Sequence, residues 1–420
     1  MSNQTKQINT KWIKAILPFN IAIGPVSTLI ALMILELHGT VLDVGFAVTL
    51  FNAFSIPAAI FWGFLTDYYF NRKILIFFSN IGTAAVLLLF TQAHSIYQIF
   101  LLYSLFSFIT AAVTTPLNLL VMETNPKKSW STAFAWFSMI ISIGQACGLF
   151  LSMIWSAYFI LSYLAIPLSI LSFCSGILSM VMIKKPDICL ERETILHSKY
   201  SFRERLRHIP FMFLRIPNSG DFKRVFRSLK YDLTLNTPVL ILSIFMFYIA
   251  SGIFNTSIVP SLSANDVPSI SIFAVIAIVD LVQILSFRFA GAYGEKNSLR
   301  KASINGLALR GFCYALAGVC FFLVTGVWYA IPIAILYSLG GGVAYSIYYT
   351  AANTMVYNAV DGRRGNASAL GVYSALVAIA TLMGSLISGL SSFYLGFGVT
   401  FMIAGLGLGV SIWLLSLPKS

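Results

Sequence analysis

The sequence predicts an all-α polytopic membrane protein with twelve transmembrane helices in two pseudo-symmetric six-helix bundles. Of its 420 residues, 58% are hydrophobic and only 10% are charged, which is more apolar surface than one water-soluble core can bury. Apolar segments of about 20 residues or more, long enough to cross a bilayer as helices, recur along the whole chain. Stretches such as "AAVLLLF" lack the strict alternation of a membrane β-strand, so helices are favoured.

Charges, prolines and short polar clusters separate the apolar segments. The first span follows the polar, basic "MSNQTKQINTKWIK" without a small-residue cleavage site, which favours a retained helix over a removed signal peptide. We expect an N-terminal six-helix bundle at 1–183, a cytoplasmic linker at 184–236 and a C-terminal six-helix bundle at 237–420. The predicted spans are residues 13–35, 43–67, 72–92, 97–123, 130–157, 160–183, 237–260, 269–292, 301–325, 328–357, 365–389 and 393–417.

The basic residues predict the orientation of these spans. With a cytoplasmic N-terminus, 25 of the 27 Lys and Arg residues fall in or beside inside segments, and the other two, Arg288 and Arg310, lie within spans. Lys and Arg accumulate in cytoplasmic loops because their translocation is unfavourable. We therefore expect a multi-pass protein of the cell membrane with both termini in the cytoplasm. The same distribution accounts for the net charge of +13 without a nucleic-acid partner.

The predicted linker at 184–236 contains 12 basic and 6 acidic residues. Within it, "DFKRVFRSLK" places four apolar side chains at helical spacing, with basic residues on the other faces. Such an amphipathic helix suits an anionic membrane surface, and a solvated linker helix fits the pattern equally well.

One charged motif occurs twice, after the second span of each half. "GFLTDYYFNRK" begins at residue 63 and "GAYGEKNSLRK" at residue 291, and the two align without gaps at an offset of 228 residues. The positive-inside rule explains the basic residues of both copies, but it does not explain the acid at the same place in each. The aligned pairs are Gly63 with Gly291, Asp67 with Glu295, Arg72 with Arg300 and Lys73 with Lys301.

This motif resembles the signature of the major facilitator superfamily, G-x3-D-[RK]-x-G-x-[RK]-[RK], which joins the second and third spans and recurs more weakly between the eighth and ninth. Together with the six-plus-six topology, the resemblance covers essentially the whole chain. It implies a secondary transporter that works by alternating access. The copies depart from the signature at Tyr68, Phe70 and Ser298, which replace a basic residue and two glycines.

The resemblance also implies a gate on the cytoplasmic side. In the family, the acid of the first copy contacts the start of the eleventh span when the inside is closed, which here is "DGRRGNAS". Asp67 is therefore expected to meet Arg363 and Arg364, and by pseudo-symmetry Glu295 is expected to face Lys127 and Lys128. Gly63 would let the second span approach a neighbouring helix closely.

The resemblance further implies a solute cavity near the bilayer midplane, lined by the first, fourth, seventh and tenth spans. Each of these spans carries a polar or aromatic stripe without a charge, which favours a neutral or amphipathic organic solute over phosphate or a dicarboxylate. The same side chains are also common as contacts between helices. The candidate binding residues are Asn20, Thr110, Thr114, Tyr248, Asn255, Tyr345, Tyr349 and Asn353.

Two charges lie inside spans at nearly equal depth. Asp280 in the eighth span and Arg310 in the ninth fall on adjacent antiparallel helices, so a salt bridge is expected. The pair has two possible roles: a structural ion pair, or a coupling site at which Asp280 binds and releases a proton.

Other functional classes fit the sequence less well. A drug or metabolite efflux antiporter would be marked by an Arg in the fourth span and a Gly-Pro motif in the fifth, where this chain has only Gly144 and Gly148 at packing distance. A membrane-embedded enzyme or metal site needs clustered ligands, and the four His and five Cys are scattered, so we expect no enzymatic activity, metal or cofactor. A channel-like protein would not need two matched gating motifs. The expected partners are a small-molecule solute, membrane lipids and, in the coupled alternative, a proton, and the chain is expected to act as a monomer.

Overall fold

The computed structural model describes residues 11–68, 72–124, 130–183, 237–360 and 366–417, and every regular element within them is helical. Twelve helical segments are long and apolar enough to span a membrane, which confirms the predicted number of spans. The predicted amphipathic helix of the linker lies outside the described residues.

The first six spans form the N-terminal half. The first span is broken at Pro25 into two helices, α1 and α2, after a short 3₁₀ turn. The helices of this half are α1 (Leu17–Ile23), α2 (Val26–Glu36), α3 (Val41–Tyr68), α4 (Arg72–Phe90), α5 (Ile96–Thr124), α6 (Trp130–Tyr158) and α7 (Ala165–Met182).

The C-terminal half repeats this plan, with an irregular tenth span. A π-helical segment at Ser338–Ala344, which contains three consecutive glycines, separates α14 from α15. Segments of this type often occur at functional sites. The helices of this half are α11 (Thr237–Ser263), α12 (Ser269–Lys296), α13 (Leu299–Leu323), α14 (Ala330–Tyr337), α15 (Tyr345–Val360), α16 (Asn366–Leu395) and α17 (Phe397–Ser416).

The largest boundary error concerns the last two spans. The polar cluster at 390–392 suggested a break there, but α16 continues to Leu395 and the chain turns at Gly396, whose φ of 84° suits glycine. The serines of this cluster face other helices: Ser392 bonds with Ser257 at 2.7 Å, and Thr400 donates to Ser391 at 3.1 Å. Hydroxyls satisfied in this way stay inside a span.

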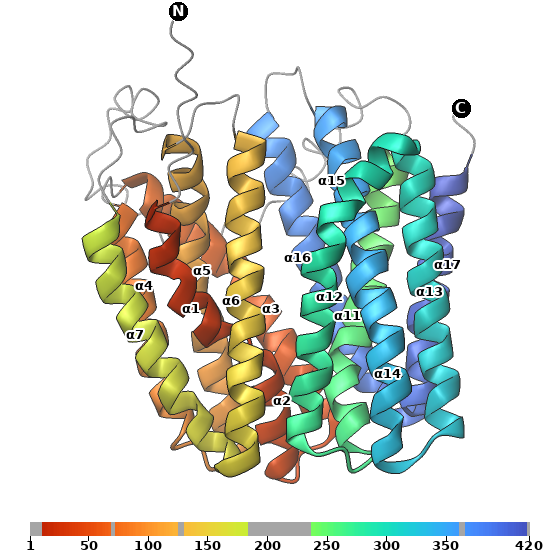
Figure 1. Ribbon diagram of the computed structural model, residues 1–420, viewed down its shortest axis with the longest axis horizontal. Helices are drawn as coiled ribbons and strands as arrows, with labels where there is room; N and C mark the ends of the chain where they lie inside the picture. Colours follow the sequence, from red (N-terminus) through yellow and green to blue (C-terminus); the bar gives the residue numbers. More distant parts are fainter. Residues whose placement is uncertain (1–10, 69–71, 125–129, 184–236, 361–365, 418–420) are drawn as a thin grey trace, which may run out of the picture.

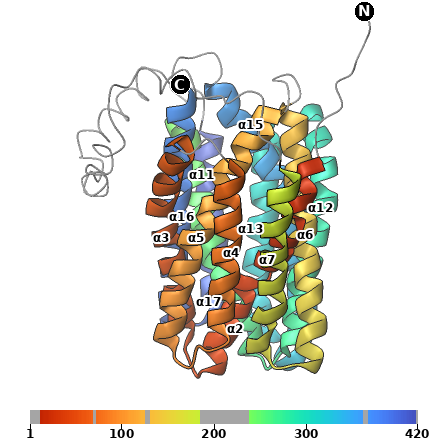
Figure 2. The same ribbon diagram turned by 90° about the vertical axis from the view of Figure 1, so that its left-hand side faces the viewer.

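The start of the first helical segment and the end of α17 lie at the same side of the helical bundle, which we call the termini side; the opposite side is the far side (Figure 1). Within the N-terminal half α4 packs on α5 and α7, and within the C-terminal half α11 packs on α16 and α17. The halves meet where α3 packs on α16 and α6 on α12, and the ribbons of α6 and α12 converge toward the far side. Figure 2 shows α3 beside α16 in the perpendicular view.

The buried apolar contact between the halves is concentrated on the far side. One large cluster joins the C-terminal core to far-side residues of the N-terminal half, including Ile30 and Val44. On the termini side the N-terminal half has a separate cluster, around Trp12, Leu120 and Phe137, that contains no residue of the other half. The described part of the chain is therefore a conformation closed on the far side.

Two glycines allow this closure. A Cβ on Gly45 of α3 would lie 2.5 Å from the Cα of Gly389 on α16, so the two backbones touch without side chains between them. One turn further along α3, the Thr49 hydroxyl lies 3.0 Å from that of Ser385. The halves thus meet here through backbone contact and a hydroxyl pair.

The predicted glycine packing in the fifth span is confirmed. A Cβ on Gly148 of α6 would lie 2.1 Å from the carbonyl oxygen of Ile21, and one on Gly144 would lie 2.6 Å from the Cβ of Asn20. These glycines let α6 press against α1.

Candidate functional site

The candidate site is organised around Arg310, a buried cation on α13. Its side chain is only 2% exposed, and its Nε donates to the hydroxyl of Tyr314, one turn further along the helix, at 2.8 Å. Among the residues that the structure describes, its Nη1 has no hydrogen-bond partner. A buried guanidinium with unused donors and a positive charge is the least expected feature of a membrane interior.

Three aromatic rings surround this guanidinium. Its Cζ lies 4.9 Å from the ring centre of Phe247 on α11, and 5.1 Å from the centres of both Tyr314 and Tyr345. The negative faces of such rings attract a cation and offset part of its lost hydration. Phe254, two turns beyond Phe247, stacks on Tyr314 with ring centres 3.7 Å apart and so fixes the ring that accepts the bond from Arg310.

Beyond Tyr345 the aromatic cluster becomes accessible. Tyr345 and Tyr349, adjacent on one face of α15, stack with ring centres 5.3 Å apart, and Phe287 of α12 meets both rings edge-on at 6.2 and 6.0 Å. Tyr345 is half-buried, whereas Tyr349 is 37% exposed. The three rings form an aromatic wall, with Arg310 behind it and Tyr349 at its open edge.

An amide and a phenol lie on the same half, nearer the far side. Asn255 on α11 is exposed, and its Oδ1 accepts a hydrogen bond from the hydroxyl of Tyr337 at 3.2 Å. The Tyr337 ring packs on Phe254, which connects this polar pair to the rings around Arg310. Stacking surfaces and an open amide are the groups that bind a flat, polar organic molecule.

The expected salt bridge between Asp280 and Arg310 is wrong for this conformation. Both residues are described, and no ion pair or hydrogen bond joins them: Arg310 turns toward Tyr314 and the rings instead. Asp280 lies seven residues before Phe287, so the two share a face of α12. Asp280 is half-buried, and Tyr337 lies within electrostatic range of both Asp280 and Arg310.

Comparison with known proteins identifies the family. The family model described as Major Facilitator Superfamily matches residues 15–360. The chain belongs to the major facilitator superfamily. A search of curated proteins by sequence gives no match.

Solved structures with the same fold include transporters of the superfamily. A mutant of the nucleoside transporter NupG superposes with a TM-score of 0.72 at 14% identity, covering 97% of this chain and 98% of that one. A mutant of the peptide transporter POT gives 0.70 at 13% identity, covering 97% and 92%, and the same mutant in complex with sulfate gives 0.68 at 11%, covering 96% and 94%. At these identities the likeness establishes the fold, and it confirms the predicted twelve-helix architecture of the superfamily.

Of the candidate binding residues, those of the C-terminal half lie on the helices of the aromatic cluster. Tyr345 and Tyr349 form the wall, Asn255 belongs to the open amide pair, and Tyr248, half-buried, packs edge-on against Phe247. Asn353, half-buried, lies one turn beyond Tyr349 on α15.

Two candidates of the N-terminal half make hydrogen bonds within the first and fourth spans. Asn20 is buried at the contact between α1 and α6, and its Nδ2 donates to the carbonyl oxygen of Ile16 at 2.9 Å. Thr110 donates to the carbonyl oxygen of Phe106, at 2.8 Å, within its own helix. Thr110 is half-buried and Thr114 is exposed. A short polar side chain satisfies itself on its own backbone, which sequence spacing does not reveal.

Several side chains of the site were not anticipated. Three of them, Phe247, Phe254 and Phe287, look in the sequence like ordinary apolar residues of a membrane span. Two more, Tyr314 and Tyr337, lie outside the polar stripes of the predicted cavity-lining spans. A signal existed for one contact, because Arg310 and Tyr314 are spaced i, i+4 on one helix.

The superfamily motif is described only in part. Arg72 donates to the carbonyl oxygen of Thr66 at the end of α3, whereas Arg300 reaches the end of α17 and donates to the carbonyl oxygens of Leu415, at 2.6 Å, and Leu417. Both arginines thus satisfy carbonyls at helix ends, where cations are favoured. Lys73 is half-buried and Lys301 is exposed. The structure does not describe the surroundings of four motif residues, Gly63, Asp67, Gly291 and Glu295. Two predicted partners, Arg363 and Arg364, lie wholly outside the described residues.

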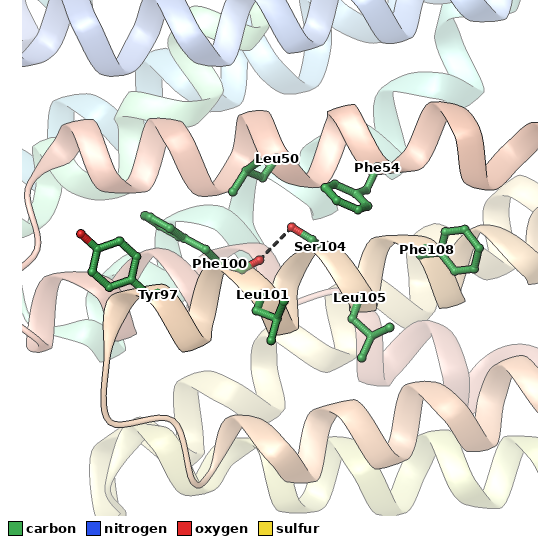
Figure 3. A pocket seen from close by; sticks show the side chains of 8 residues that line it. All are labelled: Leu50, Phe54, Tyr97, Phe100, Leu101, Ser104, Leu105 and Phe108. Atoms are coloured by element: carbon green, nitrogen blue, oxygen red, sulfur yellow. Dashed lines mark hydrogen bonds between the residues drawn. The ribbon is translucent and has the colours of Figure 1, made fainter. Parts of the chain in front are cut away.

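A groove on the outer wall of the N-terminal half offers no chemistry for a polar solute. It has a volume of about 440 Å³ and lies between α3 and α5, where six of its side chains, including Phe54 and Leu101, are apolar (Figure 3). The hydroxyl of Ser104 is already bonded to the carbonyl oxygen of Phe100 at 2.8 Å. Tyr97, at one end of the groove, is exposed. We assign the groove to the lipid-facing surface.

Within the described residues, no group of three or more His, Cys, Asp or Glu side chains is placed to hold a metal ion. Cys147, Cys174, Cys313 and Cys320 are free thiols.

Proposed function

We propose that this protein is a secondary active transporter of the cell membrane that moves a small neutral or amphipathic organic solute by alternating access. Membership of the superfamily and the transporter fold support the class of function. The class of solute is inferred from the aromatic wall formed by Tyr345, Tyr349 and Phe287, because its rings can stack on a flat organic molecule.

The conformation fits one stage of such a cycle. The halves are joined by buried contacts on the far side, where Gly45 meets Gly389, and the termini side of the N-terminal half packs on its own. With the termini in the cytoplasm, as the basic residues indicate, this is a state closed to the outside. The reverse step would close the termini side, with Asp67 meeting Arg363 and Arg364 as the motif implies.

Asp280 is proposed to couple transport to a proton. Among the described residues it has no ion-pair partner, it shares a helical face with Phe287, and it lies within electrostatic range of Tyr337. A carboxyl group in this position can bind a proton in one state and release it in the other, because its surroundings change when the halves rock.

The transport function is tested with purified protein in proteoliposomes. The first probes are labelled nucleosides and dipeptides, because structures of the same fold are described as nucleoside and peptide transporters; a series of other neutral amphipathic solutes follows. Saturable uptake with exchange between internal and external solute supports a carrier. A solute flux that rises linearly with concentration and does not saturate would instead indicate a channel. The absence of flux for every solute tested would refute the proposal.

Proton coupling is tested with Asp280→Asn. In the wild type, an imposed pH gradient is expected to drive accumulation of the solute. In the variant, accumulation is expected to fall to the level without a gradient, while exchange of solute down its own gradient continues, because only the protonation step is removed. Arg288→Gln, a charge change at an exposed position on the same helix, is the matched control. Gradient-driven accumulation that survives in Asp280→Asn would contradict the coupling role.

A further inference from the structure

We infer that Arg310 is the binding point for a carboxylate of the transported solute, so that the solute is an amphipathic monocarboxylate with a flat apolar body. The inference rests on the proposed function and makes its substrate class more specific. It departs from the sequence prediction, in which no cavity stripe carried a charge, because Arg310 comes from the ninth span rather than from a predicted lining helix.

The first step is the state of the guanidinium. Arg310 is 2% exposed, its Nη1 has no hydrogen-bond partner among the described residues, and Asp280 does not pair with it. A buried charge is normally paired, because burial without a counter-charge is strongly unfavourable. The rings of Phe247, Tyr314 and Tyr345 attract the cation, but they accept no strong hydrogen bond. The guanidinium of Arg310 therefore lacks a hydrogen-bond acceptor, and an anionic acceptor would also supply the missing counter-charge.

The second step is the chemistry that fits. A guanidinium presents its N–H groups in a planar fork that matches the two oxygens of a carboxylate. Only Nε is engaged in a described hydrogen bond, with the Tyr314 hydroxyl, so the fork retains donors for a second partner. One buried hydroxyl without a partner in the described residues, that of Ser251, lies on α11, one turn from Phe247.

The third step is the route. Tyr345 lies between the guanidinium and Tyr349, the exposed ring of the aromatic wall. A flat apolar body stacked on Tyr349 would place its carboxylate beside Arg310 once the Tyr345 ring shifts off the guanidinium, and the shifted ring would stay in contact with the solute. The same movement would replace a cation–ring contact by an ion pair, so binding would change the packing between α13 and α15.

The test measures ligand-induced shifts of the unfolding temperature of the purified protein. Three probes are compared: phenylacetate, its neutral isostere phenylacetamide, and chloride. We expect phenylacetate to stabilise the wild type at concentrations at least about tenfold lower than either of the others. In Arg310→Gln this preference should disappear, while the weak effect of phenylacetamide remains. Arg310→Lys keeps the charge and should keep part of the preference, and Arg288→Gln, with the same change at an exposed site, should behave as the wild type.

A second readout separates binding from a structural role. Without ligand, Arg310→Gln should unfold at the same temperature as the wild type or higher, because it removes an unpaired buried charge. A large loss of stability in the ligand-free variant would show a structural cation and overturn the inference. Equal stabilisation by phenylacetate and chloride would indicate a small-anion site and would also overturn the inference. The same holds if phenylacetate does not bind the wild type, or if it binds Arg310→Gln as well as it binds the wild type. In all these cases, saturable transport of neutral solutes would leave the proposed function intact.

Discussion

Gly45→Leu is expected to open the far side of the protein and to reduce transport about tenfold or more. The Cα of Gly389 lies 2.5 Å from where a Cβ at residue 45 would be, so a branched side chain cannot fit while α3 and α16 remain in contact. Overpacking of this kind typically costs about 1 to 3 kcal/mol, and about 1.4 kcal/mol corresponds to a tenfold change in a two-state equilibrium. The state closed on the far side should therefore become rare.

The effect on conformation is measured by thiol labelling. Ser385, which is 1% exposed and faces Thr49 across the same contact, is replaced by Cys in a background without the native cysteines. A membrane-impermeant thiol reagent should label this Cys faster in Gly45→Leu than in the parent. Gly409→Leu is the control, because no atom lies within 4 Å of a Cβ at that position. Normal transport in Gly45→Leu would contradict the assignment of this contact as the closed gate.

Tyr345→Ala is expected to weaken solute binding about 30-fold. The variant removes one ring of the aromatic wall, and burying a side chain of this size contributes about 2 kcal/mol, which corresponds to that factor. The expected change is in the apparent affinity for the solute, since the ring contacts solute in the proposed binding mode and is remote from the gate. Transport is measured against solute concentration in proteoliposomes.

Two variants show whether the ring or the packing matters. Tyr345→Phe keeps the stack with Tyr349 and Phe287 and should remain within a few-fold of the wild type. Tyr394→Ala removes an exposed ring at the far side and should have no effect. If Tyr345→Ala transported with unchanged affinity, the aromatic wall would not be the binding surface.

Much of the fold could be predicted from the sequence because the bilayer restricts it so strongly. Span number followed from apolar length, and most boundaries followed from charges and prolines, since both are governed by transfer from water to lipid. The exception, the break predicted at 390–392, shows the limit of that reasoning: Ser391 and Ser392 look like loop residues, yet they bond to Thr400 of α17 and Ser257 of α11. Hydropathy cannot tell a polar residue in water from one satisfied by a neighbouring helix.

The site was predicted less well, because depth in the membrane does not give the direction of a side chain. Asp280 and Arg310 were predicted at similar depths, but Asp280 shares a face with Phe287 while Arg310 bends toward Tyr314 and Phe247. Rotation of each helix about its axis decides such contacts, and it depends on close packing, here on Gly306 against Tyr348. The three consecutive glycines of the π-helical segment are visible in the sequence, but hydropathy and helical spacing do not predict the change of helix type there.

A reversible cross-link between Thr49→Cys and Ser385→Cys tests the central claim, alternating access, most directly. The two hydroxyls are 3.0 Å apart in this conformation, so an oxidised pair should hold the far side closed. The background lacks Cys147, Cys174, Cys189, Cys313 and Cys320, and either single Cys variant is the control. Our account predicts that oxidation abolishes solute transport in the double variant and that a reducing agent restores it. Undiminished transport through fully cross-linked protein would show that this contact does not have to open, and would contradict the account.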